Sequence, residues 1–203
     1  ARRLAPSEAG IALAWAELAR RSGVPRRAFD LLSEALRSIQ GAFELHQALI
    51  DLCVEQDVVE RLPALYEELE CTRPSDPLVW FYGGYCDLLQ GELAVRELRW
   101  SAAEAHFQAA STHLALARDL EPGYADGVRR SAARARSGAG WCALGRGELS
   151  RSSEIFLEVL ERDGDLRYEP NGLGRSLLDA LGLLGSRFEA AGDFTQGVAM
   201  MQR

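Results

Sequence analysis

The stretch GVPRRAFDLLSEAL, residues 23–36, carries the pattern that decides the fold. It opens with a Gly-Val-Pro turn at Gly23 and continues into a segment with helical periodicity. Alanines stand seven positions apart, at Ala28 and Ala35, with the larger Leu32 between them. Because these three residues share one face of a helix, the spacing predicts close contact with a neighbouring helix through the small residues.

The pattern recurs at an interval of 34 residues, with corners expected at Gly23, Asp57 and Gly91. Positions after the first two corners carry the pairs Ala28 and Leu62, Leu32 and Tyr66, and Ala35 and Leu69. Positions before the corners carry the sets Trp15, Leu49 and Gly83, and Ala16, Ile50 and Gly84. Each unit is therefore predicted to be two antiparallel helices joined at a corner, where Gly or Asp accepts a positive φ.

This pattern resembles the tetratricopeptide repeat (TPR) family, whose 34-residue helix-turn-helix units stack into a superhelix. The best matches are RAFDLLSEAL (residues 27–36) and WFYGGYCDLLQGE (residues 80–92), and ALARDLEPGYADG (residues 115–127) resembles the usual helix end, with Pro122 as terminator. The resemblance covers roughly residues 9–203. It implies an all-α fold, a right-handed superhelical array of about five antiparallel helix hairpins.

The repeat changes its register after Gly91, where the small-large-small trio returns seven residues late, at Ala103, Phe107 and Ala110. Pro122 comes seven residues later still. Since seven residues make about two helical turns, we expect lengthened helices in the third and fourth units, around 92–120 and 123–145. A continuous helix across Trp100 is favoured, although Ser101 to Glu104 has the pattern of a capping box that would place a break there.

We expect residues 1–203 to form a single domain of stacked hairpins, with later corners at Gly147 and Gly192 and a loop over 163–174. The expected units are about 9–42, 43–76, 77–122, 123–164 and 165–203, the last incomplete. Because the chain begins at Ala1 without Met, we expect a fragment or a processed form.

Composition excludes several functions. A net charge of −7 disfavours nucleic acid as a partner, and no apolar run reaches the length of a membrane span. The four cysteines contain no C-x-x-C, which argues against a zinc site, and free thiols in a reducing cytoplasm are favoured over disulfides. All 23 basic residues are Arg, which suggests a GC-rich, bacterial coding sequence. Because free thiols are typical of a reducing compartment, we expect a cytoplasmic location.

No enzyme is expected, and no cofactor or metal. The three histidines form no recognisable catalytic or metal-binding pattern, and His46 falls at a core-facing position of the repeat. The Gly-rich segments lack the Lys of a phosphate-binding loop and follow no strand.

The family resemblance implies that the first helix of each hairpin lines a concave surface. The lysine, asparagine and arginine clamp of chaperone-binding members is absent, because the matching positions carry Leu13, Glu17, Gln47 and Phe81. The predicted partner-binding residues are an acidic strip followed by an apolar patch: Glu44, Gln47, Asp51, Glu55, Leu78, Phe81, Tyr85 and Leu88. This face would suit a basic peptide with an apolar anchor. The alternative is that the aromatic residues pack against a neighbouring hairpin or a second copy of the chain and the acids are merely solvated.

The densest basic run, residues 128–137, contains Arg129, Arg130, Arg134 and Arg136. These arginines could contact an acidic partner, or lie as solvated side chains over the hairpin. Together with the family resemblance, the sequence predicts a protein-interaction scaffold. The alternative is a regulatory, targeting or self-assembly domain of a larger multidomain protein or enzyme, with no activity of its own.

Overall fold

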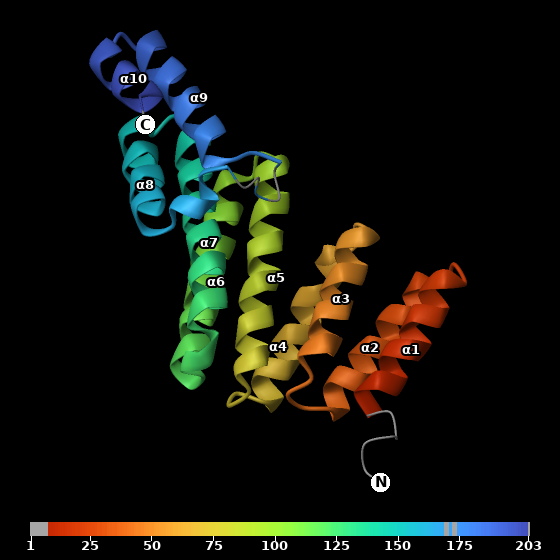
Figure 1. Ribbon diagram of the computed structural model, residues 1–203. Coiled ribbons are helices and arrows are strands. Elements are labelled where there is room, and N and C mark those ends of the chain that lie inside the picture. Colours follow the sequence, from red (N-terminus) through yellow and green to blue (C-terminus); the bar gives the residue numbers. More distant parts are fainter. Residues whose placement is uncertain (1–7, 169–170, 172–173, 203) are drawn as a thin grey trace.

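The computed structural model describes residues 8–168, 171 and 174–202, and within these ranges it contains helices and no strand. Figure 1 shows the helices stacked side by side into an elongated array. The α-helices are α1 (Glu8–Arg21), α2 (Pro25–Ser38), α3 (Phe43–Glu55), α4 (Leu62–Thr72), α5 (Pro77–Arg96), α6 (Trp100–Leu120), α7 (Ala125–Gly145), α8 (Leu149–Arg162), α9 (Leu177–Ala190) and α10 (Phe194–Met201). Short 3₁₀ turns occur at η1 (Val59–Arg61), η2 (Pro122–Tyr124) and η3 (Gly164–Arg167).

Four antiparallel hairpins pair directly among the described residues: α1 with α2, α5 with α6, α7 with α8 and α9 with α10. The helices α3 and α4 of the second hairpin both contact η1 and meet through the side chains of His46 and Tyr66. Neighbouring odd-numbered helices from α1 to α9 also contact one another. The odd-numbered helices therefore form one layer of the array. The expected all-α array of helix hairpins is confirmed. The predicted loop over 163–174 lies partly outside the described residues.

The five hairpins turn through the same backbone geometry. A residue with positive φ ends the first helix of each hairpin, and these residues are Gly23 (73°), Asp57 (53°), Leu98 (59°), Gly147 (78°) and Gly192 (84°). In each case the next backbone N–H donates to a carbonyl five residues earlier, as from Val24 to Ala19 at 3.0 Å. This is the Schellman ending of a helix. The expected corners at Gly23, Asp57, Gly147 and Gly192 are confirmed.

The expected corner at Gly91 is wrong, because the third hairpin turns seven residues later, at Leu98. The continuous helix over 92–120 is wrong for the same reason, and the chain breaks immediately before Trp100. The capping box does not form, because α6 is capped at Arg99 without a side-chain hydrogen bond.

Both helices of the third hairpin are longer than those of the first. α5 and α6 have 20 and 21 residues, against 14 each in α1 and α2. The inserted residues thus lengthen the helices on both sides of the corner. The expected lengthening of the helix over 123–145 is also confirmed, since α7 has 21 residues.

The aromatic ring of Phe107 joins three of the long helices. It projects from α6 and is 2 % exposed. A Cβ added at Gly91 in α5 would lie 2.6 Å from this ring, and one added at Gly138 in α7 would lie 2.3 Å from it. Such separations are far below van der Waals contact. The two glycines are therefore required by the close approach of α5, α6 and α7.

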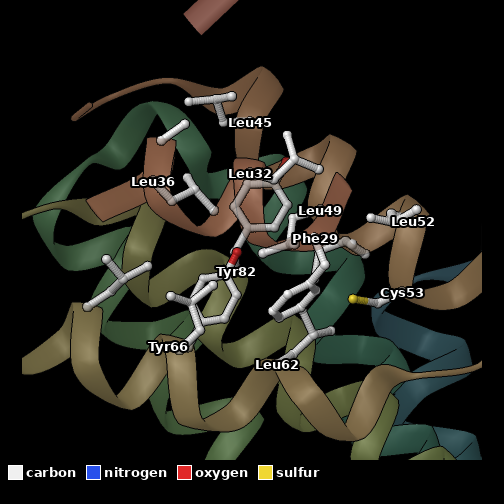
Figure 2. Close-up of a cluster of buried hydrophobic side chains, with 14 of the residues drawn as sticks. Phe29, Leu32, Leu36, Leu45, Leu49, Leu52, Cys53, Leu62, Tyr66 and Tyr82 are labelled. Atoms are coloured by element: carbon white, nitrogen blue, oxygen red, sulfur yellow. The ribbon is translucent and has the colours of Figure 1, made fainter. Parts of the chain in front are cut away.

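The N-terminal core contains three buried residues with polar rings, His46, Tyr66 and Tyr82, surrounded by leucines. Figure 2 shows Tyr66 and Tyr82 with several of these leucines. His46 lies in the core as expected and is 1 % exposed. Its Nδ1 is 2.9 Å from the Tyr66 hydroxyl, and its ring stacks on Tyr82 at a centroid distance of 4.9 Å. Burial lowers the pKa of His46 from 6.5 to about 4, because a charged imidazole would lose its hydration there.

Replacing Gly138 with Ala should destabilise the protein by about 1–3 kcal/mol, because the added methyl group would displace the Phe107 ring. Gly182→Ala is the matched control, since this α9 glycine is exposed and a Cβ there would meet nothing within 4 Å. The control should instead stabilise by about 0.5–1 kcal/mol through helix propensity. Urea unfolding midpoints of both variants measure the difference, and equal effects would contradict the packing of Phe107 described above.

The stability of the fold should depend on pH through His46. Its pKa is about 4 in the folded chain and near 6.5 when unfolded, so the unfolded state binds more protons between these values. The free energy of unfolding should therefore fall, by on the order of 2–3 kcal/mol, as pH drops from 6.5 to 4.

The control for this effect is His46→Asn, which keeps a polar group near Tyr66 but does not titrate. His113 works in the opposite direction, because Asp87, whose Oδ2 lies 3.0 Å from its Nδ1, raises the pKa of His113. That contribution remains in both proteins and cancels in the comparison. The free energy of unfolding, measured by denaturant titration at a series of pH values, should depend less steeply on pH in the variant. An identical pH dependence in both proteins would contradict the role given to His46.

Candidate functional site

A groove of about 420 Å³ lies between α1, α2 and α3. Small and aliphatic side chains form its floor, and these are Leu13, Ala16, Ala28, Leu32, Ala48 and Leu52. Charged side chains form its rim, and these are Glu17, Arg20, Asp51 and Glu55. We call this site the acidic groove, because three carboxylates and one guanidinium line it.

Arg20 bridges two of the carboxylates of the acidic groove. Its Nε lies 2.8 Å from Glu17, and its Nη1 lies 3.0 Å from Glu55. Arg21 adds a second contact to Glu17 at 2.6 Å, and hydrogen bonds from Arg20 and Arg21 lower the pKa of Glu17 to about 2. Asp51 accepts a hydrogen bond of 2.8 Å from Gln47 and makes no ion pair with a described residue. The rim therefore keeps an excess of negative charge.

A second, smaller pocket of about 180 Å³ lies where α3, α5 and the start of α7 meet. It is lined by Phe43, Leu78, Phe81, Tyr124 and two glycines, Gly123 and Gly127. The Phe81 ring lies 6.2 Å from Tyr124 and 5.2 Å from Tyr82, between ring centroids. Phe43 is 51 % exposed at the rim. We call this site the aromatic pocket.

Most of the predicted acidic strip lies on or beside these two sites. Asp51 and Glu55 line the acidic groove, and Gln47 connects Asp51 to the core by accepting a hydrogen bond of 3.0 Å from the Tyr82 hydroxyl. Glu44 is exposed at the start of α3, next in sequence to the exposed Phe43 of the aromatic pocket.

The predicted apolar patch is divided by the fold. Leu78 and Phe81 line the aromatic pocket, although Leu78 is only 3 % exposed. Tyr85 instead faces α7, where its hydroxyl accepts a hydrogen bond of 3.3 Å from Arg134. The surface position predicted for Leu88 is wrong, because this side chain is fully buried in the core between α5 and α6. The added length of α5 places Leu88 in mid-helix, where a neighbouring helix covers it.

Three of the four predicted arginines of residues 128–137 form ion pairs with carboxylates in the described part of the chain. Arg129 pairs with the buried Asp163 at 2.6 Å, Arg134 with the buried Glu92 at 2.8 Å, and Arg136 with Glu158 at 2.7 Å. The fourth member, Arg130, is exposed beside Tyr85 and Arg134. The pairs of Arg129 and Arg134 compensate buried negative charge, whereas that of Arg136 lies at the surface. The run therefore does not form a continuous basic strip.

Several site residues were not assigned from the sequence. Arg20 completes the rim of the acidic groove, and its spacing from Leu13 and Glu17 places all three on one face of α1. That helical spacing was a usable signal. Phe43 and Tyr124 belong to a helix start and a 3₁₀ turn, where periodicity does not report which way a side chain points.

Other features of the described residues concern thiols, metals and membranes. The four cysteines are free, and burial raises the pKa of Cys53 and Cys142 to about 12, which keeps both thiols protonated. The part of the chain described here contains no group of three or more His, Cys, Asp or Glu that could hold a metal. Among the same residues, no helix combines the length and apolar character needed to cross a bilayer.

No protein-family model and no curated protein matches the sequence. Among solved structures, a MamA RS-1 double mutant matches with a TM-score of 0.55 at 14% identity, covering 98% of this chain and 93% of that one. MamA from Desulfovibrio magneticus RS-1, residues 41 to the end, matches with a TM-score of 0.54 at 14% identity, with 98% and 94% covered. A TPR protein of Thermus thermophilus gives a TM-score of 0.42 at 14% identity, with 95% and 87% covered.

At this identity the similarity concerns the fold and not the activity. MamA is a TPR-like protein, and its similarity extends over nearly the whole of both chains. The stacked hairpins with their common corner geometry agree with it. The chain therefore has a tetratricopeptide-repeat-type fold.

Proposed function

We propose that the chain is a non-catalytic protein-interaction scaffold that binds a basic peptide segment of a partner protein in the acidic groove. The observation that carries the proposal is the arrangement of Glu17, Asp51 and Glu55 around an apolar floor. The TPR-type fold supports a scaffold in general terms, since arrays of this kind expose extended binding surfaces.

The charges of the acidic groove favour a cationic ligand. Arg20 holds Glu17 and Glu55 in place, so these carboxylates lose little freedom when a partner binds. Asp51 accepts a single hydrogen bond from Gln47, and its carboxylate has remaining acceptor capacity for a guanidinium or ammonium group. The floor between them can take the aliphatic stem of the same side chain.

The aromatic pocket supplies the apolar anchor site. Phe43 and Phe81 present aromatic surface to a pocket that is large enough for one side chain. Glu44 and Gln47 lie on α3 between this pocket and Asp51, so one peptide could contact both sites. Buried aromatic contacts of this kind often dominate the binding energy of an interface.

Neutralising the rim should weaken binding of the basic peptides. An array of Arg- and Lys-rich peptides with one Leu or Phe would identify a binder, whose affinity for the Asp51→Asn/Glu55→Gln variant is then measured by calorimetry. We expect the affinity to fall about five- to ten-fold, because two charge contacts are lost.

Glu34→Gln/Glu67→Gln is the control, because both of these exposed residues lie on the second helices α2 and α4. A second arm tests the anchor, with Phe43→Ala expected to weaken binding by about ten-fold or more and Tyr85→Ala expected to have little effect. If the control weakens binding as much as the rim variant, general charge attraction and not the groove explains the affinity.

A second candidate is self-assembly, because both end faces of the array are apolar. The outer face of α1 exposes Ile11, Trp15 and Leu18 at 46–58 %, and that of α10 exposes Phe194, Val198 and Met201 at 48–67 %. Two such faces could meet head to tail between copies of the chain.

Light scattering across the micromolar range tests self-assembly, and the mean mass should rise with protein concentration. Trp15→Glu or Phe194→Glu should each abolish the rise, because a heterologous contact needs both faces. Val54→Glu introduces the same charge at an exposed apolar residue of α3 and should leave the rise intact. A chain that stays monomeric throughout excludes this candidate.

A further inference from the structure

A pocket of about 390 Å³ lies in the C-terminal half of the chain, between the α5–α6 corner, the end of α7 and α9. It is well separated in sequence from the acidic groove, and none of the residues predicted from the sequence lines it. Its volume is within the range typical of ligand sites. We call it the arginine pocket.

The arginine pocket is basic in an acidic protein. Arg96, Arg175 and Arg187 line it, and no Asp or Glu is among the described lining residues. The whole chain carries a net charge of −7, so three guanidinium groups around one cavity are a local exception. Charge complementarity therefore favours an anionic occupant, the reverse of the acidic groove.

The walls of the arginine pocket are apolar and held in place. Trp100 lies flat against α7, because a Cβ added at Gly145 would be 2.6 Å from its ring. The guanidinium of Arg175 lies over the ring of Trp141, 5.4 Å from its centroid. Large rigid rings beside guanidinium groups suit an occupant that combines a carboxylate with an apolar side chain.

Trp141 also carries an unsatisfied hydrogen-bond donor. Its side chain is 95 % buried, since the residue is 5 % exposed, and its Nε1 has no hydrogen-bond partner among the described residues. A buried donor without an acceptor costs free energy, about 1–3 kcal/mol. Because the same atom is closed to solvent, this cost belongs to the packing of Trp141, and an occupant of the pocket does not relieve it.

Leu98 is the second unusual feature, because it combines backbone strain with exposure. It is the residue with positive φ at the third corner. The equivalent residue is Gly in three of the other corners and Asp in the fourth. A leucine with this backbone is strained by about 1–2 kcal/mol. Its side chain is nevertheless 67 % exposed at the edge of the arginine pocket, where it contacts water in the free chain.

We propose that the arginine pocket binds an acidic peptide segment of a partner protein, with one large apolar side chain seated between Leu98 and Trp100. Carboxylates that flank this side chain pair with Arg175 and Arg187 at the rim. The bound side chain covers Leu98, which explains an exposed leucine at a strained corner. This inference rests on the proposed role as a protein-interaction scaffold, but it does not depend on the acidic groove.

The probe is an array of heptapeptides with blocked ends, in which a single Leu, Ile, Met or Phe is flanked by Asp and Glu. Matched arrays replace the acids by Arg or by Ser. The full chain should bind members of the acidic array selectively. Arg175→Gln/Arg187→Gln should weaken this binding by about ten-fold or more, because charge-assisted hydrogen bonds are lost.

Arg26→Gln/Arg27→Gln is the control for charge, because both arginines are exposed at the start of α2 in the N-terminal hairpin. This variant should bind the acidic peptides as the unchanged chain does. Asp51→Asn/Glu55→Gln should also leave this binding intact. A failure of the arginine pocket and a failure of the acidic groove are therefore distinguishable.

Leu98→Gly separates a binding role from a structural one. Glycine relieves the strained corner, so the melting temperature should rise by about 2–4 °C. The same change removes the apolar contact, so affinity for the acidic peptides should fall about five-fold. Asp57→Gly, at the equivalent corner of the second hairpin, should raise the melting temperature without changing the affinity.

Three results would overturn the proposal. The first is an acidic array that binds no better than the Arg or Ser arrays. The second is binding that survives both Arg175→Gln/Arg187→Gln and Leu98→Gly. The third is a chain that binds none of the acidic peptides but binds octanoate, a small anionic amphiphile, in a saturable way. That result would assign the pocket to a small molecule.

Discussion

The fold depends on close contact between helices at positions where one partner has no side chain. Phe107 is the central case, because its ring fills the space left by Gly91 on α5 and Gly138 on α7. It thereby connects the core of the N-terminal hairpins to that of the C-terminal ones through α6. A hairpin alone would leave one face of apolar residues in water, so each depends on its neighbour for burial. The arginine pocket lies between helices that contacts of this kind hold in register, since Trp100 packs in the same way against Gly145 of α7.

The sequence predicted the repeat well where the corner residue was typical of its position. Gly23, Gly147 and Gly192 have no side chain to oppose a positive φ, and Asp57 tolerates it. The failure at the third corner has a clear cause. Glycine serves both at a helix end and inside a tightly packed helix, and periodicity does not distinguish Gly91 from a corner. Nothing about Leu98 in the sequence signals a turn, because the neighbouring helices impose that backbone on a residue that does not favour it.

The candidate sites were predictable in part. Helical spacing places Asp51 and Glu55 on one face of α3, and the family resemblance implied that this face would meet a partner. Contacts between hairpins were not predictable. The pairing of Arg134 with Glu92 spans 42 positions, and that of Arg129 with Asp163 spans 34. The arginine pocket draws its residues from four helices and two connecting segments, so only their arrangement in space reveals that three guanidinium groups surround one cavity.

The extra length of α5, α6 and α7 has a consequence for cooperativity. In an array of equal repeats, every interface has similar strength and opening can start at any of them. Here three helices of 20 or 21 residues share the Phe107 contact, whereas the helices of the first hairpin have 14 each. The array should therefore behave as a stiff centre with weaker ends, and local fluctuations should concentrate at its extremities. Amide hydrogens of the middle helices would then exchange only when the whole chain unfolds.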